Sequence, residues 1–148
     1  MAMTAALMMS GSVAQAQDVN IGRSNITLTS DLMTPETLWA MGRIGAAQAS
    51  PDGKKIVYQV GYYSVKENKG HQVLRVMDAD GKNDRLLTTS AKSEGDAAWL
   101  DNNTLAFLTG GQLWTMNADG TNRKQLTHSD IDIEGFRFSP DRKRVVLI

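Results

Sequence analysis

One segment of this chain occurs twice. Residues 76–88 are repeated by residues 115–127, with Asp80 corresponding to Asp119 at an offset of 39 residues. Each copy has an apolar strand end, a polar turn centred on Asp-Gly, and a second short strand that ends in Leu-Thr. Glycine accepts the positive φ that such a tight turn requires. The duplicated turn therefore predicts two copies of one antiparallel β unit.

A second set of landmarks gives the same spacing. Ser50 and Ser139 each begin a Ser-Pro-Asp turn, and Leu100 occupies the equivalent place between them. Leu100 and Ser139 are again 39 residues apart, and a polar hairpin insertion at residues 62–70 accounts for the longer distance from Ser50. A period near 40 residues is typical of the four-stranded blades of a β-propeller.

The predicted fold class is therefore all-β: a partial propeller of about two and a half four-stranded blades over residues 46–148, preceded by one short helix. The first blade has predicted strands at residues 46–50, 55–60, 72–77 and 85–88. The second has them at residues 97–99, 104–109, 112–116 and 124–127. A third blade begins with residues 135–141 and 144–148. Because the last apolar run stops at Ile148, we expect the chain to be a truncated part of a longer protein.

A lead-in over residues 17–45 contains the single helix signal, at residues 34–42. Thr34 can cap the helix, Pro35 suits its first position, and Glu36 suits the positive end of the helix dipole. Its apolar face consists of Leu38, Trp39 and Met41, and Gly42 is the expected stop.

The first 16 residues resemble the remnant of an export signal. Residues 1–11 are apolar and small, and Ala14-Gln15-Ala16 has the form of a signal-peptidase site. The basic start of such a signal is absent, since the first basic residue is Arg23. A disordered Ala/Met-rich tail is the alternative. The run is too short to span a bilayer, so we expect an exported protein, located in the bacterial periplasm, with no membrane span.

The balanced charge argues against some kinds of partner, and the absence of cysteine excludes some kinds of chemistry. The chain has 16 basic and 16 acidic residues, so its balanced charge gives no electrostatic signature of nucleic-acid binding. It has no cysteine, which excludes disulfides, thiolate catalysis and cysteine-bound metals. We expect neither a cofactor nor a metal.

No catalytic residues are predicted. The Gly-x-Ser-x-Gly nucleophile motif is absent, because residues 22–26 lack the second glycine. His71 and His128 lie at strand and loop ends and are predicted to be hydrogen-bonded surface side chains. Residues 78–81 superficially resemble a calcium loop. Val76 and Leu87 occupy positions where such a loop needs acids, so a turn is predicted instead.

The tryptophans and glutamates give no sign of a functional site. Trp99 and Trp114 fall in predicted strands and are expected in the core between blades. The glutamates are isolated from one another in the sequence: Glu36, Glu67, Glu94 and Glu134.

The order of motifs resembles the start of prolyl oligopeptidase family serine peptidases. It runs from residues 33–44 through Ser-Pro-Asp-Gly at residues 50–53 to the Asp-Gly turn that ends in Leu87-Thr88. The resemblance is greatest to the exported bacterial dipeptidyl-peptidase and acylaminoacyl-peptidase branch. The blade motif at residues 117–127 alone resembles TolB-type propellers equally well. The helix ahead of the first blade favours the peptidases.

The resemblance implies a function for a longer protein. In that family a propeller precedes an α/β-hydrolase domain with a Ser-Asp-His triad, covers the active site and restricts entry to short peptides or chain ends. The implied partners are a peptide substrate and the chain's own C-terminal hydrolase domain, which these 148 residues do not contain. Dipeptidyl peptidases of the family also hold the substrate amine with a glutamate pair, which the isolated glutamates here do not supply. The alternative is a non-enzymatic, TolB-like periplasmic propeller that binds partner proteins.

Overall fold

The computed structural model describes residues 21–24, 26–27 and 30–148. The predicted signal remnant at residues 1–16 lies outside the described residues, as does part of the lead-in. The described chain is mostly β-strand with one short helix, which confirms the all-β class. Its elements are α1 (Pro35–Ala40), β1 (Arg43–Ala49), β2 (Lys55–Ser64), β3 (Lys69–Asp78), β4 (Arg85–Leu86), β5 (Glu94–Trp99), β6 (Thr104–Thr109), β7 (Gln112–Asn117), β8 (Lys124–Gln125), β9 (Phe136–Phe138) and β10 (Val145–Leu147).

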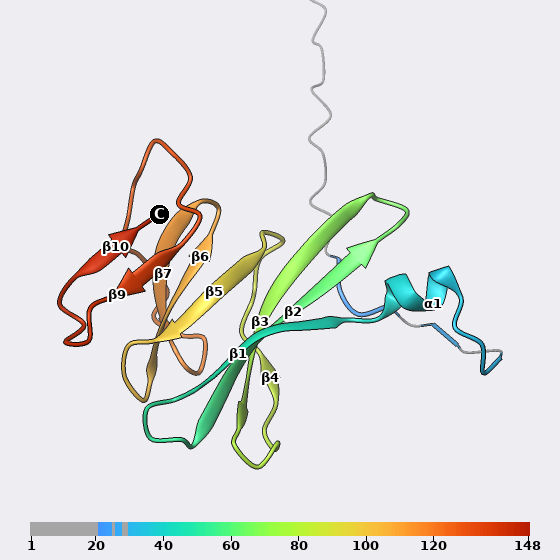
Figure 1. Cartoon of the computed structure of the whole chain (residues 1–148), viewed down its shortest axis with the longest axis horizontal. Helices are drawn as coiled ribbons and strands as arrows, with labels where there is room; N and C mark the ends of the chain where they lie inside the picture. The colour runs from blue at the N-terminus through green and yellow to red at the C-terminus, as the bar shows by residue number, and fades with distance from the viewer. Residues whose placement is uncertain (1–20, 25, 28–29) are drawn as a thin grey trace, which may run out of the picture.

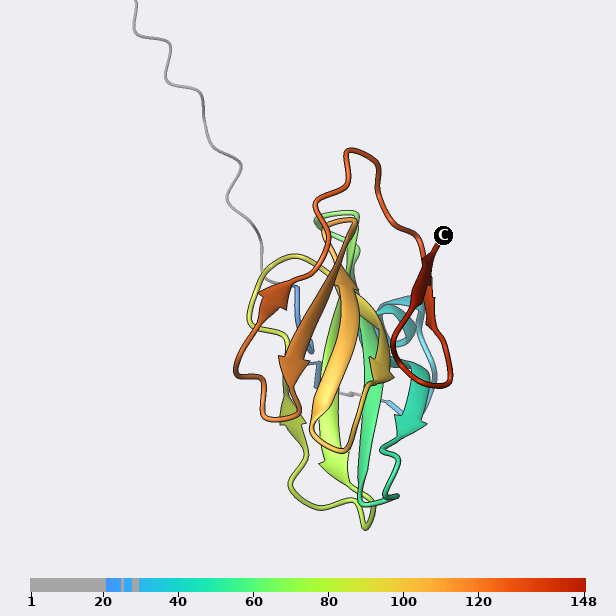
Figure 2. The same ribbon diagram turned by 90° about the vertical axis from the view of Figure 1, so that its left-hand side faces the viewer.

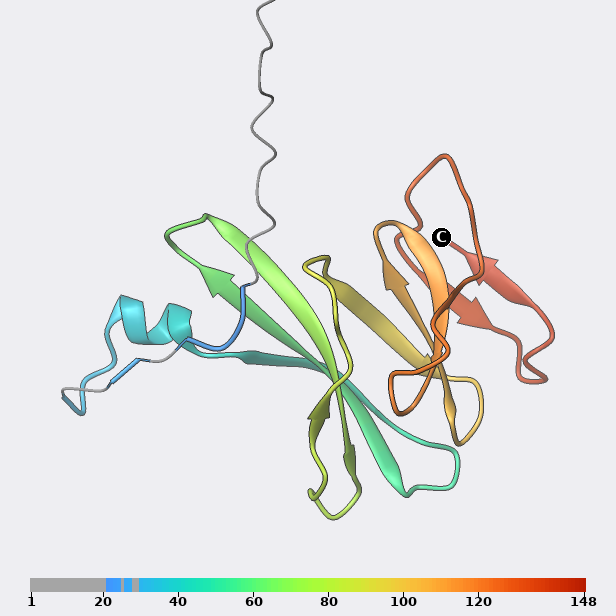
Figure 3. The ribbon, with the colours of Figure 1, turned by 180° about the vertical axis from the view of Figure 1, so that it is seen from behind.

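The strands form three antiparallel sheets in chain order. The first sheet has the order β1-β2-β3-β4, the second β5-β6-β7-β8, and β9 pairs with β10 in the third. Both predicted four-stranded units are therefore confirmed. Figure 1 shows the sheets following one another across the molecule, with α1 at one end and β10 at the other, and Figure 3 shows the same order from behind. They form an open array rather than a closed ring, so the propeller assignment stays a prediction.

The predicted insertion at residues 62–70 lengthens one hairpin. β2 and β3 continue pairing as far as Ser64 and Lys69, so only residues 65–68 form the turn. The first strand of each four-stranded sheet has a register shift, between Ile44 and Ala47 in β1 and between Gly95 and Ala98 in β5. The two units thus share an irregularity as well as a strand order.

The main hydrophobic core lies between the first two sheets. Leu74 and Val76 of β3 pack with Trp99, Leu105 and Phe107 of the second sheet. Side chains alternate between the two faces of a strand, so Ala106, between Leu105 and Phe107, joins a second core with Leu113 and Phe136. Figure 2, looking along the row of sheets, shows their strands one behind another.

The helix is shorter than predicted. Thr34 caps it by accepting a hydrogen bond from the Thr37 amide at 3.2 Å, and Pro35 is its first residue. It ends at Ala40, not at Gly42, because Met41 is already extended (φ −73°, ψ 135°) and β1 begins at Arg43. Gly42 instead allows the Tyr62 ring to pack closely against the backbone, since a Cβ at this position would lie 2.8 Å from Tyr62 Cε1. Among the described residues, no helix is long and apolar enough to cross a membrane.

Candidate functional site

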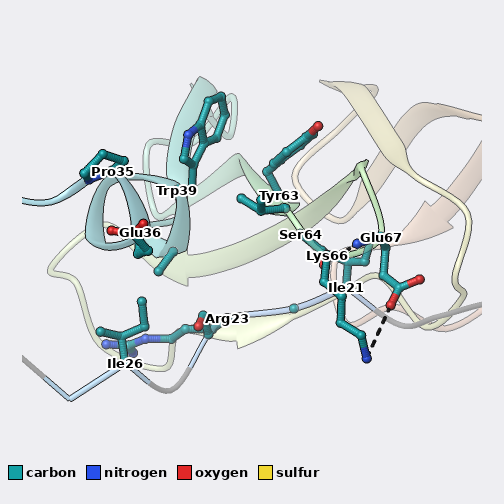
Figure 4. A pocket seen from close by; sticks show the side chains of 14 residues that line it. Ile21, Arg23, Ile26, Pro35, Glu36, Trp39, Tyr63, Ser64, Lys66 and Glu67 are labelled. Atoms are coloured by element: carbon teal, nitrogen blue, oxygen red, sulfur yellow. Dashed lines mark hydrogen bonds and ion pairs between the residues drawn. The ribbon is translucent and has the colours of Figure 1, made fainter.

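One candidate site among the described residues is a pocket of about 680 Å³ between α1, the β2–β3 hairpin and the segment that begins at Ile21. We call it the helix–hairpin pocket. Figure 4 shows Trp39 and Tyr63 along one wall and Arg23 and Ile26 along the other. A volume of this size falls in the range of sites for small ligands.

The aromatic wall is held in place by neighbouring side chains. The rings of Trp39 and Tyr63 are 4.9 Å apart, and the Arg43 guanidinium lies 4.8 Å from the Trp39 ring. Arg43 also donates a hydrogen bond to the Leu38 carbonyl at 3.4 Å, while the Tyr63 hydroxyl donates to Asn68 in the hairpin turn. These contacts fix the wall before any ligand arrives, which lowers the entropic cost of binding.

The rim of the pocket carries charges of both signs. Glu36 lies in the first turn of α1, and Glu67 lies in the hairpin turn, where its amide bonds the Ser64 hydroxyl at 3.2 Å. Lys66 approaches Glu67 only to 3.9 Å, and its side chain is fully exposed, so this ion pair contributes little. An apolar wall with charges of both signs at its rim suits an apolar group that carries a polar or charged end.

The base of the pocket is tied to the first sheet. Ile21 is 7% exposed, and its carbonyl lies 2.7 Å from His71 Nδ1. The other ring nitrogen of His71 lies 3.3 Å from the Lys92 carbonyl. His71 is 4% exposed, so the prediction of a surface histidine was wrong at this position because residues 21–24 cover it, although the prediction of satisfied hydrogen bonds was right.

A polar cluster borders a neighbouring pocket of about 630 Å³. Arg75 donates two hydrogen bonds to Asp84, at 3.1 and 2.7 Å, and the Tyr58 hydroxyl donates a third at 2.8 Å. These donors, Arg75 first, lower the pKa of Asp84. Burial, followed by the bond to Asp84, raises the pKa of Tyr58. Each group already has its partner, so the cluster has no free nucleophile or base.

Another charged pair lies between the first two sheets. Glu94 is 1% exposed and accepts a hydrogen bond from Arg123, which lies in the loop between β7 and β8. No local sequence pattern indicates this pair. The two lie 29 positions apart, and only the folding of the second sheet brings them together.

Two curated bacterial proteins are similar to this chain in sequence. A dipeptidyl-peptidase 5 of Porphyromonas endodontalis is 35% identical over 125 residues, and one of Porphyromonas gingivalis is 41% identical over 125 residues. Each alignment covers 81% of this chain and 18% of the relative. No family model matches the chain.

Solved structures of peptidases are also similar to this chain in fold. An acylaminoacyl peptidase of Pyrococcus horikoshii superposes with a TM-score of 0.61 at 12% identity, over 75% of this chain and 18% of that one. The AtxE2 isopeptidase without ligand gives 0.61 at 18% identity, over 78% and 23%. The chain is related to the prolyl oligopeptidase-family peptidases. This peptidase-related chain spans about 18% of the length of the curated relatives it matches.

The peptidase-related chain brings no set of catalytic side chains together within its described residues. His128 is exposed, as predicted, and the two ring nitrogens of His71 each lie within 3.3 Å of a backbone carbonyl oxygen. The part of the chain that the structure describes contains no cluster of three or more His, Asp or Glu side chains able to hold a metal. The calcium-like residues 78–81 form the predicted turn, in which the Gly81 amide bonds the Asp78 carbonyl at 2.9 Å.

The tryptophans divide between core and pocket. Trp99 is 2% exposed and lies in the core between the first two sheets, and Trp114 is half-buried against the same core, so their predicted positions are confirmed. Trp39 was predicted only to belong to the apolar face of the helix. Its side chain is 41% exposed at the pocket, and the capped helix was the sole sequence signal that could have indicated this site.

Proposed function

We propose that this chain is the N-terminal propeller portion of an exported serine peptidase that cleaves short peptides. In this proposal residues 46–148 form two blades and the start of a third, and they restrict access to a catalytic α/β-hydrolase domain elsewhere in the protein. The observation that carries the proposal is the 35–41% identity to two dipeptidyl-peptidases over 125 residues. The two four-stranded sheets with matching strand order support it.

The helix–hairpin pocket is the proposed contact with the peptide end. Its fixed aromatic wall at Trp39 and Tyr63 would accept an apolar side chain, and the rim carboxylates of Glu36 and Glu67 would attract a free amine. Export to the periplasm is proposed from the small-residue motif at residues 14–16. Protein sequencing of the mature form would then give Gln17 as the first residue.

Hydrolysis assays on the complete gene product test the peptidase assignment. We expect it to cleave dipeptidyl-coumarin substrates, and we expect a serine-directed fluorophosphonate to block that cleavage. The 148-residue chain alone should cleave none of them. A complete gene product without hydrolase activity would instead favour the TolB-like binding protein.

The role of the pocket is tested in the same assay. Trp39→Ala should raise KM about tenfold or more with kcat little changed, because it removes a preformed apolar contact used in binding. Leu38→Ala is the matched control, since Leu38 is exposed on the same helix and does not line the pocket. Equal effects of the two substitutions would contradict a role for the pocket in peptide recognition.

A further inference from the structure

The second carboxylate oxygen of Glu94 has no partner. Oε1 accepts the hydrogen bond from Arg123, whereas Oε2 is buried and has no hydrogen-bond donor among the described residues. A buried carboxylate oxygen without a donor is costly in the ionised form, because it has lost its water and gained nothing in return. Protonation of Oε2 lowers that cost without moving the side chain, because a neutral carboxyl loses less on leaving water than a carboxylate does.

Glu94 lies where the first two sheets meet. Its partner Arg123 also donates to the Leu87 carbonyl of the first sheet at 3.2 Å, and its guanidinium lies 4.9 Å from the Phe107 ring of the second. Leu87 follows β4 and is tied to β3 by its amide, which donates to the Leu74 carbonyl at 2.8 Å. The ion pair is therefore part of the contact between the sheets.

Three groups among the described residues act on the Glu94 carboxyl. Arg123 approaches it from the second sheet, and Thr88 and His71 approach it from the first. Burial is the largest influence and raises the pKa of Glu94, while these three groups oppose the rise. The Thr88 hydroxyl lowers the pKa by its proximity but makes no hydrogen bond to Oε2, so one oxygen stays unpaired and the net direction agrees with the geometry.

We propose that Glu94 is a proton-operated latch between the first two sheets: protonation keeps them together, and ionisation favours their separation. Parting of the sheets would admit water to Oε2, which is the other way to relieve its burial. Since the closed form holds the proton more tightly than an open form, the closed form is favoured at low pH and weakens as the pH rises through the pKa of Glu94. The inference rests on the proposed restriction of peptide access and names its regulation by pH.

Amide hydrogen exchange of the 148-residue chain tests the latch directly. The reporters are the Leu87 amide and the Trp99 amide, which bonds Gln48 across the sheets at 3.1 Å. After correction for intrinsic rates, their protection should fall about tenfold between pH 4.5 and 8 in the wild type. Glu94→Gln should keep the low-pH protection throughout. The ¹³C shift of the Glu94 carboxyl should titrate over the same range as the loss.

The control is Glu134→Gln, which changes an exposed glutamate and should keep the wild-type profile. Two results would overturn the latch. One is a Glu94→Gln chain with the wild-type pH dependence. The other is a Glu94→Gln chain with lost protection at every pH, because the charge would then hold the sheets together. Peptide hydrolysis is not measured, so failure of the latch would leave the proposed peptidase function standing.

Discussion

The two Asp-Gly turns are alike down to single residues. Gly81 and Gly120 have φ values of 84° and 86°, and Asn83 and Asn122 both have φ 53°. In each turn the aspartate preceding the glycine accepts a hydrogen bond from the amide two residues on, at 3.0 Å in the first and 2.9 Å in the second. The repeated sequence therefore encodes a repeated backbone conformation, and not only a repeated composition.

Replacing the turn glycine tests this directly. Gly81→Ala should lower the free energy of unfolding by about 1–2 kcal/mol, because an L-residue is strained at this φ while its Cβ would meet no atom within 4 Å. Gly22→Ala is the control: its Cβ would also be in open space, without a positive φ, so the change should stay within about 0.5 kcal/mol. Urea unfolding measures both. Equal losses would argue against backbone strain as the cause.

The Arg75–Asp84 pair should stabilise the fold in a pH-dependent way. Asp84→Asn should lower the free energy of unfolding by about 0.5–1 kcal/mol at neutral pH, a modest amount because both side chains are partly exposed. Arg75 lowers the pKa of Asp84, so its contribution is present above the ordinary aspartate pKa and is lost as the pH falls through the lower folded value.

Urea unfolding at a series of pH values checks this prediction. The difference between wild type and Asp84→Asn should shrink below about pH 4. A difference that persists unchanged at lower pH would mean that the substitution acts through packing rather than through the charge of Asp84.

At the scale of elements, the sequence predicted the features that depend on neighbouring residues, namely the turns and the start of the helix. Turns at Asp-Gly and Gly110-Gly111 placed both four-stranded units correctly, and Thr34 with Pro35 placed the start of α1. The end of the helix was less predictable, because Gly42 meets the distant Tyr62.

Contacts between distant segments could not be predicted from the sequence. His71 is buried by Ile21, 50 positions earlier in the chain, and Glu94 meets Arg123 only after β5 and β8 have joined one sheet. The helix–hairpin pocket likewise requires β2 and β3 to extend to Ser64 and Lys69, so that the hairpin reaches α1. No local pattern indicates any of these partners.

Packing between the sheets depends strongly on Trp99. Its side chain is buried in the core, and its indole N–H donates to the Gln48 carbonyl at 3.0 Å. Trp99→Phe should lower the free energy of unfolding by about 2–4 kcal/mol, since it leaves a void and removes this hydrogen bond. Trp114→Phe should cost less than half as much, because Trp114 is only half-buried. Similar losses in urea unfolding would contradict this account of the core.

At the scale of the whole molecule, the three sheets are stacked but do not close. The core between the first two sheets continues into a second core with Phe136 of the third sheet. Beyond it, the apolar side chains of Val146 and Ile148 are 65% and 69% exposed. Under the propeller proposal, such surfaces are covered by further strands and by the next blade.

The structure of the complete gene product is the most direct test of the proposal. We predict that β9 and β10 become part of a four-stranded sheet, that further sheets of this kind close a ring with the first sheet, and that an α/β-hydrolase domain lies against that ring. A structure in which β10 remains an edge strand, or in which a closed ring stands without a hydrolase domain, would contradict the proposal that this chain is the propeller portion of a peptidase.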